Sequence, residues 1–172
     1  MARFLVSFLL VASLSSAQGN PDFSGEWTLD EERSDDGEAV ILGGIGNPDR
    51  MSPKDRRTAE RLVDLVRALR VLEIRQSPSD FRLYDEADNV RIYYIDGKKH
   101  ARETPWGEKL ETETKWEGSE LQMRTDGKDL GEIDEIYAMV GPDLLYTVKL
   151  RLEGSKQEIL VRTYYSRAAS PE

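Results

Sequence analysis

Residues 20–30, NPDFSGEWTLD, combine a turn with the start of a β-strand. The opening NPD triplet has turn chemistry, because proline presets its backbone and Asn and Asp side chains bond to nearby backbone groups. From residue 25 onward polar and apolar side chains alternate, with Trp27 and Leu29 on one face. This alternation predicts a half-buried strand over residues 25–30, the only strand expected before a long helix.

The segment before this strand is typical of an export signal. Arg3 gives a positive start, residues 4–14 form a short apolar run, and residues 15–17 are small enough for a cleavage site. The run is shorter than the roughly 20 residues that a membrane-spanning helix needs. We therefore expect a signal peptide over residues 1–17, no membrane span and a periplasmic or secreted protein; a buried N-terminal helix is the alternative. Residues 18–172 then form a single domain.

The composition limits the partners that the protein can have. Asp and Glu total 33 against 24 Lys and Arg, which gives a formal net charge of -9. Nucleic-acid binding relies on basic surface that displaces counterions, so the acidic chain argues against it and against anionic membranes. The sequence contains no cysteine, which excludes disulfides and thiol chemistry. We expect a soluble monomer.

One amphipathic helix is expected after the first strand. Ser52 caps it and Pro53 occupies its first position, and the helix extends over residues 53–70. Residues 31–50 are interpreted as a loop, because their LGGIGNP core lacks the spacing of a phosphate-binding loop. The helix is expected to cover the sheet; a membrane-surface or partner-binding helix is the alternative. Its apolar face carries Ala59, Leu62, Val63, Val66 and Leu69.

After residue 70 the sequence predicts short strands separated by turns. Short turns force neighbouring strands to run antiparallel, and such a sheet hides its edges by closing. The predicted fold is mainly β: an antiparallel up-and-down barrel of about eight or nine strands, with one inserted helix. Residues 96–108 are interpreted as a polar connection. The expected strands cover 71–76, 81–85, 90–95, 109–116, 120–125, 130–140, 144–152 and 157–165.

Alternation along these strands gives an interior that mixes aliphatic and polar groups. A solid core rarely holds many polar side chains, since each buried one needs a partner, whereas a cavity for an amphiphilic ligand accepts them. The alternative is that these groups bond one another in a solid core, which would suit a structural or protein-interaction module. The expected ligand-binding residues are Tyr94, Thr112, Thr114, Met123 and Tyr146.

Gly25 and Trp27 resemble the first strand of the lipocalin and fatty-acid-binding (calycin) superfamily. The resemblance implies that Trp27 plugs one barrel end and that Arg167 packs over it as a cation–π contact. Residues 20–36 look more specifically like secreted bacterial proteins with a lipocalin-like domain. The resemblance implies binding of a small apolar or amphiphilic molecule without catalysis.

The sequence departs from fatty-acid-binding proteins in two ways. These proteins place a helical pair after the first strand, where a loop and one helix are expected here. Their last strand carries an arginine and a tyrosine, two residues apart, that hold a ligand carboxylate. Arg162 and Tyr164 match those letters as a carboxylate clamp, but they point outward if Ile159 and Val161 lie inside. An ordinary solvated arginine is the other interpretation.

Residues for catalysis or metal binding are sparse. His100 is the only histidine, so it cannot form a histidine-rich metal site, and no nucleophile motif accompanies it. The acidic stretches 85–89 and 30–38 lack the pattern of a calcium loop, although loose calcium binding by the second is an alternative. Glu135 is the only carboxylate expected inside. The sequence predicts no cofactor and no metal and favours a protein that is not an enzyme; an enzyme of the calycin kind is the alternative.

Overall fold

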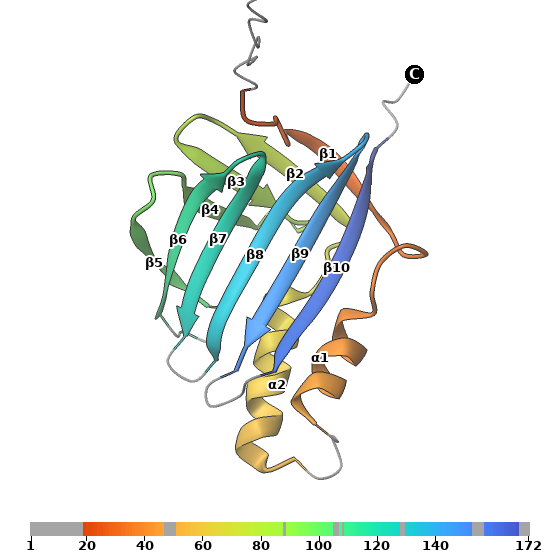
Figure 1. Ribbon diagram of the computed structural model, residues 1–172, viewed down its shortest axis with the longest axis vertical. Helices are drawn as coiled ribbons and strands as arrows, with labels where there is room; N and C mark the ends of the chain where they lie inside the picture. Colours follow the sequence, from red (N-terminus) through yellow and green to blue (C-terminus); the bar gives the residue numbers. More distant parts are fainter. Residues whose placement is uncertain are drawn as a thin grey trace, which may run out of the picture.

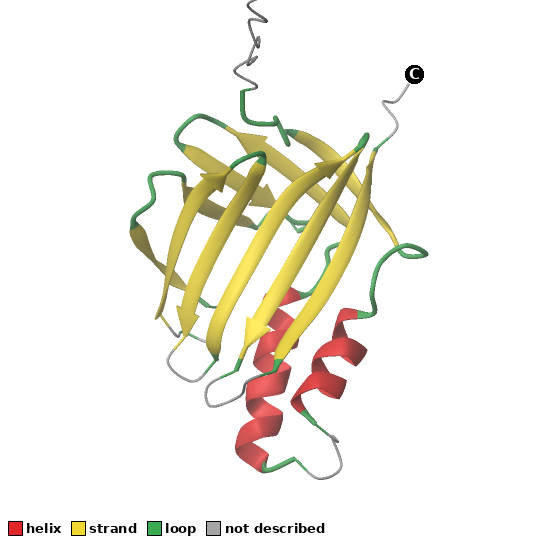
Figure 2. Cartoon of the chain, viewed as in Figure 1, coloured by secondary structure: helices red, strands yellow, loops and turns green. Residues whose placement is uncertain are grey.

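The structure, a computed structural model, describes residues 19–46, 51–87, 89–104, 107, 109–127, 130–152 and 157–168. The expected signal peptide, residues 1–17, lies outside the described residues. The fold is mainly β, as predicted, with ten antiparallel strands and two helices after the first strand (Figures 1 and 2). The strands are β1 Gly25–Asp30, β2 Val71–Gln76, β3 Asp80–Tyr84, β4 Val90–Tyr94, β5 Lys99–Glu103, β6 Lys109–Glu117, β7 Glu120–Gly127, β8 Gly131–Val140, β9 Asp143–Arg151 and β10 Glu158–Arg167.

The sheet is a meander that curls on itself without closing. Each strand pairs with its neighbour in sequence except β4 with β5, and β1 joins β10 with Trp27 opposite Arg167. β4 and β5 are therefore the two edges, although they follow each other in the chain. The closed barrel expected from the sequence is thus corrected to a barrel-like sheet with a gap between β4 and β5 (Figure 1).

Helix α1, Gly37–Ile45, lies where the sequence predicted a loop. Asp36 caps it, accepting a hydrogen bond from the Ala39 backbone nitrogen at 3.1 Å. The prediction was wrong because glycines are poor helix formers, so local propensity hid the element. Gly44 is needed for packing, since a Cβ there would lie 2.6 Å from the Ile159 side chain.

Helix α2, Pro53–Val66, begins where the sequence predicted and ends four residues before the expected residue 70. The Ser52 hydroxyl accepts a hydrogen bond from the Asp55 backbone nitrogen at 3.1 Å. Its apolar side packs on the core through Ala59, Leu62, Leu65 and Val66. Together α1 and α2 cover one end of the barrel (Figure 2). No helix in the described ranges is long and apolar enough to span a membrane.

The opposite end of the barrel is filled by aromatic side chains. Trp27 is fully buried and donates from Nε1 to the Phe23 carbonyl at 2.9 Å. The Arg167 guanidinium lies 4.7 Å from the centroid of the Trp27 ring, which is the arrangement that the lipocalin resemblance implies. Gly25 sits below it at φ 139°, and a Cβ there would lie 2.9 Å from Arg167 Nη1. Trp27 thus fills the inside of this end, and Arg167 covers it.

Candidate functional site

β4 turns inward the face opposite to the one predicted. Arg91 and Tyr93 lie opposite Leu83 and Phe81 of β3, and directly opposed residues share a face of the sheet. Tyr93 is buried, whereas Tyr94 is 49% exposed. The expectation that Tyr94 lines the interior was therefore wrong. Alternation favoured the face with Val90, Ile92 and Tyr94, because the other face carries the charged Arg91 beside Tyr93.

The sequence did not predict β5, because four of its five residues are charged or polar and only Ala101 is apolar. In the sheet Arg102 lies opposite Leu110 of β6, a fully inward residue, so its side chain enters the barrel. Its Nη1 donates to the Tyr93 hydroxyl at 2.6 Å. Its Nε and Nη2 are buried and have no partner within the described part of the chain. The interior thus contains two arginines that the sequence reasoning did not find.

Glu135 lies inside, where the sequence placed it. It comes from β8, is 1% exposed, and its Oε1 accepts a hydrogen bond from the Tyr146 hydroxyl at 2.8 Å. Its Oε2 is buried and has no partner among the residues that the structure describes. No ion pair joins Glu135 to either arginine in those ranges. Arg102 and Glu135 therefore both keep buried polar atoms that no described residue satisfies.

The charges in this cluster support one another electrostatically. Burial opposes the charged form of Arg91 and Arg102, but the Tyr93 oxygen and the Glu135 carboxylate outweigh it and raise the pKa of both guanidinium groups. Burial, and then Glu135, raises the pKa of Tyr93. Both arginines therefore stay charged and Tyr93 stays neutral at physiological pH. A charged Glu135 balances only one of the two arginines.

A cavity of about 560 Å³ lies in the gap between β4 and β5. Arg91 and Arg102 line its inner part, and Leu65 of α2 contributes an apolar wall. Val90 and Ile92, which are 45% and 42% exposed, line it toward the outside. The cavity therefore leads from the surface to the two arginines. Its other lining residues are Asp64, Asp85, Asn89, Ala101, Glu103 and Thr104.

Four of the five expected ligand-binding residues are buried inside the barrel. The Thr112 and Thr125 hydroxyls lie 2.8 Å apart, and Thr114 faces Met123 across β6 and β7. These contacts fill the centre of the barrel, and none of the four lines the cavity between β4 and β5. Tyr146 reaches the site only through its hydrogen bond to Glu135.

The expected carboxylate clamp on the last strand points outward. Arg162 is exposed, and Tyr164 lies under the Arg33 guanidinium, 4.4 Å from its ring centroid. Thr163 and Tyr165 take the inner face instead. Arg162 and Tyr164 therefore cannot hold a ligand inside this barrel. The apolar residues of β10 face inward, and Arg162 and Tyr164 occupy the alternate positions that face outward.

His100 lies opposite the buried Thr112 of β6, on the same face of β5 as Arg102, and its side chain is half-buried. Its Nε2 is 2.9 Å from Asp96 Oδ1, and its ring centroid is 4.8 Å from that of Tyr94. It does not contact the arginines. In the described ranges no group of three or more His, Asp or Glu side chains is arranged to hold a metal ion.

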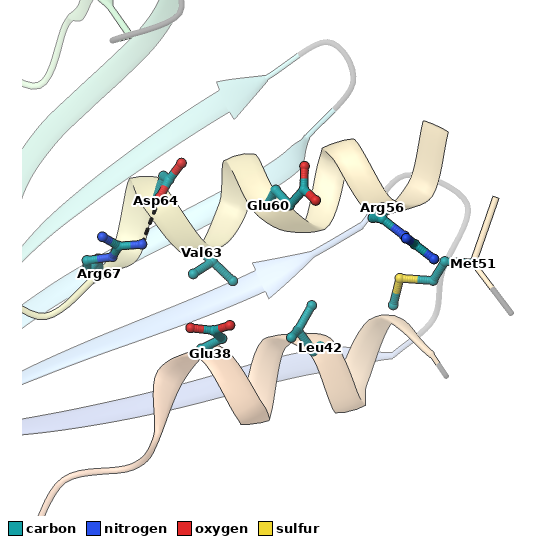
Figure 3. Close-up of a pocket in the computed structure, with 8 residues that line it drawn as sticks. All are labelled: Glu38, Leu42, Met51, Arg56, Glu60, Val63, Asp64 and Arg67. Atoms are coloured by element: carbon teal, nitrogen blue, oxygen red, sulfur yellow. Dashed lines mark hydrogen bonds and ion pairs between the residues drawn. The ribbon is translucent and has the colours of Figure 1, made fainter. Parts of the chain in front are cut away.

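A second hollow, of about 520 Å³, lies between the two helices (Figure 3). Leu42 of α1 and Val63 of α2 line its floor, and charged side chains surround them. Arg67 and Asp64 pair there at 3.0 Å, with both side chains more than half exposed. Because such exposed pairs are well solvated, this hollow lacks the desolvated polar groups that distinguish the gap.

Comparison with known proteins identifies the fold. No protein-family model matches the sequence, and no curated protein matches it. Similar solved structures include lipid binding protein 8 of Caenorhabditis elegans, with a TM-score of 0.55 and 18% identity over 85% of this chain and 95% of that chain. The ileal bile acid-binding protein of zebrafish, complexed with cholic acid, gives 0.54 and 20% identity over 85% and 98%. The REP1-NXSQ fatty acid transporter gives 0.56 and 14% identity over 86% and 97%.

These neighbours have the fold of the fatty-acid-binding proteins, and at such identities the likeness establishes the fold alone. The helical pair, of which the sequence predicted only one helix, is present as α1 and α2. That departure from fatty-acid-binding proteins was wrong, since residues 37–45 are helical. The other departure, at Arg162 and Tyr164, stands.

Proposed function

We propose that this protein is an exported carrier that binds a small apolar or amphiphilic molecule, without catalysis, in the cavity between β4 and β5. The observation that carries the proposal is the cavity that leads from the surface to Arg102, whose Nε and Nη2 are buried with no partner among the described residues. The fold supports it, because the three similar structures are of a lipid binding protein, a bile acid-binding protein and a fatty acid transporter. None of the three is named as an enzyme.

The size and chemistry of the cavity suit an amphiphile. Its volume of about 560 Å³ lies within the range of small-molecule sites, roughly 300–1,000 Å³. Leu65, Val90 and Ile92 offer apolar surface near the mouth, while Arg91 and Arg102 are polar at the inner end. A molecule with one polar and one apolar part would satisfy both regions.

Export is the second part of the proposal. It rests on the charged, apolar and small-residue regions of residues 1–17 and on the resemblance to secreted bacterial proteins. Mass spectrometry of the protein recovered from the periplasm or medium should give a mature chain that begins near Gln18. Recovery of the intact chain in the cytoplasm would contradict this part.

A structural or interaction module is the competing function, and the packed centre of the barrel favours it. Met123, Thr125 and Ile133 are fully buried, so a ligand cannot enter the centre without displacing side chains. The two functions differ in whether the gap binds small molecules. The test must therefore be aimed at the gap.

Titration of the mature chain with the neutral apolar dye Nile red tests the carrier. We expect saturable fluorescence enhancement, and we expect Ala101→Trp to weaken it about tenfold by filling the cavity. Ala39→Trp is the matched control, because this exposed alanine of α1 does not line the cavity. Native mass spectrometry of protein purified from its own host should also reveal a bound small molecule. Absence of both binding signals would favour the interaction module.

A further inference from the structure

The Arg102 guanidinium is only partly satisfied by the protein. An arginine has five N–H donors in a rigid fork, and its Nε and Nη2 form the edge that binds two oxygens of one anion. Tyr93 uses Nη1, while Nε and Nη2 are buried without a partner in the described residues. The free edge is therefore the one suited to a carboxylate.

Arg91 brings a second positive charge to the same cavity. It lines the cavity together with Arg102 and interacts electrostatically with Tyr93. The charge of Arg91 disfavours the charged form of Arg102, so the two guanidinium groups repel. Glu135 supplies one negative charge, so two positive charges and one negative charge leave one positive charge to balance. A single anionic group would neutralise the cluster.

The side chains at the rim of the cavity favour one kind of anionic ligand over another. Asp64, Asp85 and Glu103 line the mouth, so a free small anion meets repulsion there and gains no apolar contact. An apolar tail would gain contact with Leu65, Val90 and Ile92. The combination therefore favours an amphiphile over an inorganic ion.

We propose that Arg102 and Arg91 bind the monoanionic head group of the ligand, a carboxylate or its equivalent, with the tail directed along the gap toward α2. This inference rests on the proposed carrier function and names its ligand class. The head group is thus recognised from β4 and β5, the two edges of the sheet. The last strand, whose Arg162 and Tyr164 point outward, takes no part.

Calorimetry with matched probes tests the proposal on the delipidated mature chain. Decanoate and decanol have tails of equal length, and acetate has the same head group without the tail. We expect decanoate to bind at least about tenfold more tightly than decanol, and acetate to bind far more weakly than either. Arg102→Met should remove the preference for decanoate, and Arg91→Met should reduce it. Arg82→Met is the control, because Arg82 lies on the outer face of β3 and pairs with Asp80.

A second measurement does not depend on a folded variant. The measurement is an NMR titration that follows the carboxyl carbon of ¹³C-labelled decanoate. We expect the pKa of the bound carboxyl group to be lower than that of the free acid, because the guanidinium groups stabilise its charged form. A bound head group that titrates like the free acid would place it in solvent and overturn the proposal.

The outcomes separate this inference from the carrier function. If neither decanoate nor decanol binds, the carrier function itself fails. If decanoate and decanol bind with equal affinity, and Arg102→Met changes neither, the carrier function stands and the proposed anion site is wrong. If acetate binds as tightly as decanoate, the site binds small anions, and the proposal that its ligand is an amphiphile is wrong.

Discussion

Arg102 and Tyr93 join the two open edges of the sheet through their side chains. Arg102 Nη1 donates to the Tyr93 hydroxyl at 2.6 Å, although no backbone hydrogen bond links β5 to β4 in the described residues. The guanidinium carbon lies 5.4 Å from the centroid of the Tyr93 ring, so the pair also makes a cation–π contact. The gap is therefore bridged at the depth where the cavity ends.

Tyr93→Phe should weaken this bridge. The substitution keeps the buried ring and removes the acceptor of Arg102 Nη1, leaving another buried donor unsatisfied. We expect a loss of about 1–3 kcal/mol in the free energy of unfolding, measured by urea denaturation. Tyr94→Phe, on the exposed face of the same strand, should change it by less than about 0.5 kcal/mol. Equal effects of the two substitutions would contradict the role of the bridge.

Glu135→Gln should strengthen the binding of an anionic ligand. The amide keeps the shape of the carboxylate and can still accept from Tyr146, but it no longer offsets an arginine charge. We expect decanoate to bind about three- to tenfold more tightly, with decanol unchanged, in the calorimetric titration. Weaker decanoate binding by a folded Glu135→Gln variant would show that the carboxylate is needed for the site.

Alkaline pH should destabilise the protein through its buried tyrosines. Burial raises the pKa of Tyr165 from 10.0 to about 12, and its hydroxyl oxygen accepts a hydrogen bond from the Leu69 backbone nitrogen at 3.2 Å. Between these values the unfolded chain releases the proton and the folded chain keeps it. The contribution of Tyr165 to the free energy of unfolding is therefore fully present below about pH 10. It is lost as pH rises toward 12, at up to about 1.4 kcal/mol per pH unit.

Urea denaturation at pH 9, 10 and 11 measures this slope. Tyr165→Phe should make it shallower, because the variant has no phenol to titrate at that position, while burial also raises the pKa of Tyr93, Tyr137 and Tyr146. Tyr94→Phe removes an exposed phenol and should leave the slope unchanged. If Tyr165→Phe and the parent chain showed the same slope, the linkage to Tyr165 would be wrong.

Arg167→Met should destabilise the closed end of the barrel. The variant keeps a long apolar side chain but loses the cation that lies 4.7 Å from the Trp27 ring centroid. We expect a loss of about 0.5–2 kcal/mol in urea denaturation, larger if Trp27 becomes hydrated. Arg162→Met, at an exposed arginine of the same strand, is the control and should fall within about 0.5 kcal/mol of the parent.

Much of the fold could be predicted from local pattern. Alternation placed Leu110, Thr112 and Thr114 of β6 inside, and the turn residues gave the antiparallel order. Residues 37–45 and 99–103 could not be recognised, because α1 contains glycines and β5 is polar on both faces. Their conformations depend on tertiary packing and on pairing with β6, which local propensity does not contain.

The candidate site was the least predictable part. Arg102 belonged to a stretch interpreted as a connection, and Arg91 belonged to a strand with the wrong face turned inward. The parity of β10 was the useful exception, since Ile159 and Val161 correctly indicated that Arg162 points outward. Buried arginines oppose the usual hydrophobic pattern, so alternation leads away from them.

The sequence by itself determined the meander and the capped helix α2, because each depends on neighbours close in the chain or on a simple period of two; the filled end around Trp27 was expected only from the resemblance to lipocalins. Only the tertiary structure decided that Arg91, Tyr93 and Arg102 share one cavity. Their meeting depends on the register of β4 against β3 and on the curl of ten strands that brings β5 back toward β4. Both depend on contacts between residues far apart in the sequence. The register that buries Phe81 and Leu83 of β3 also turns Arg91 of β4 inward, and the free energy gained by burying the two apolar side chains offsets the cost of desolvating the arginine.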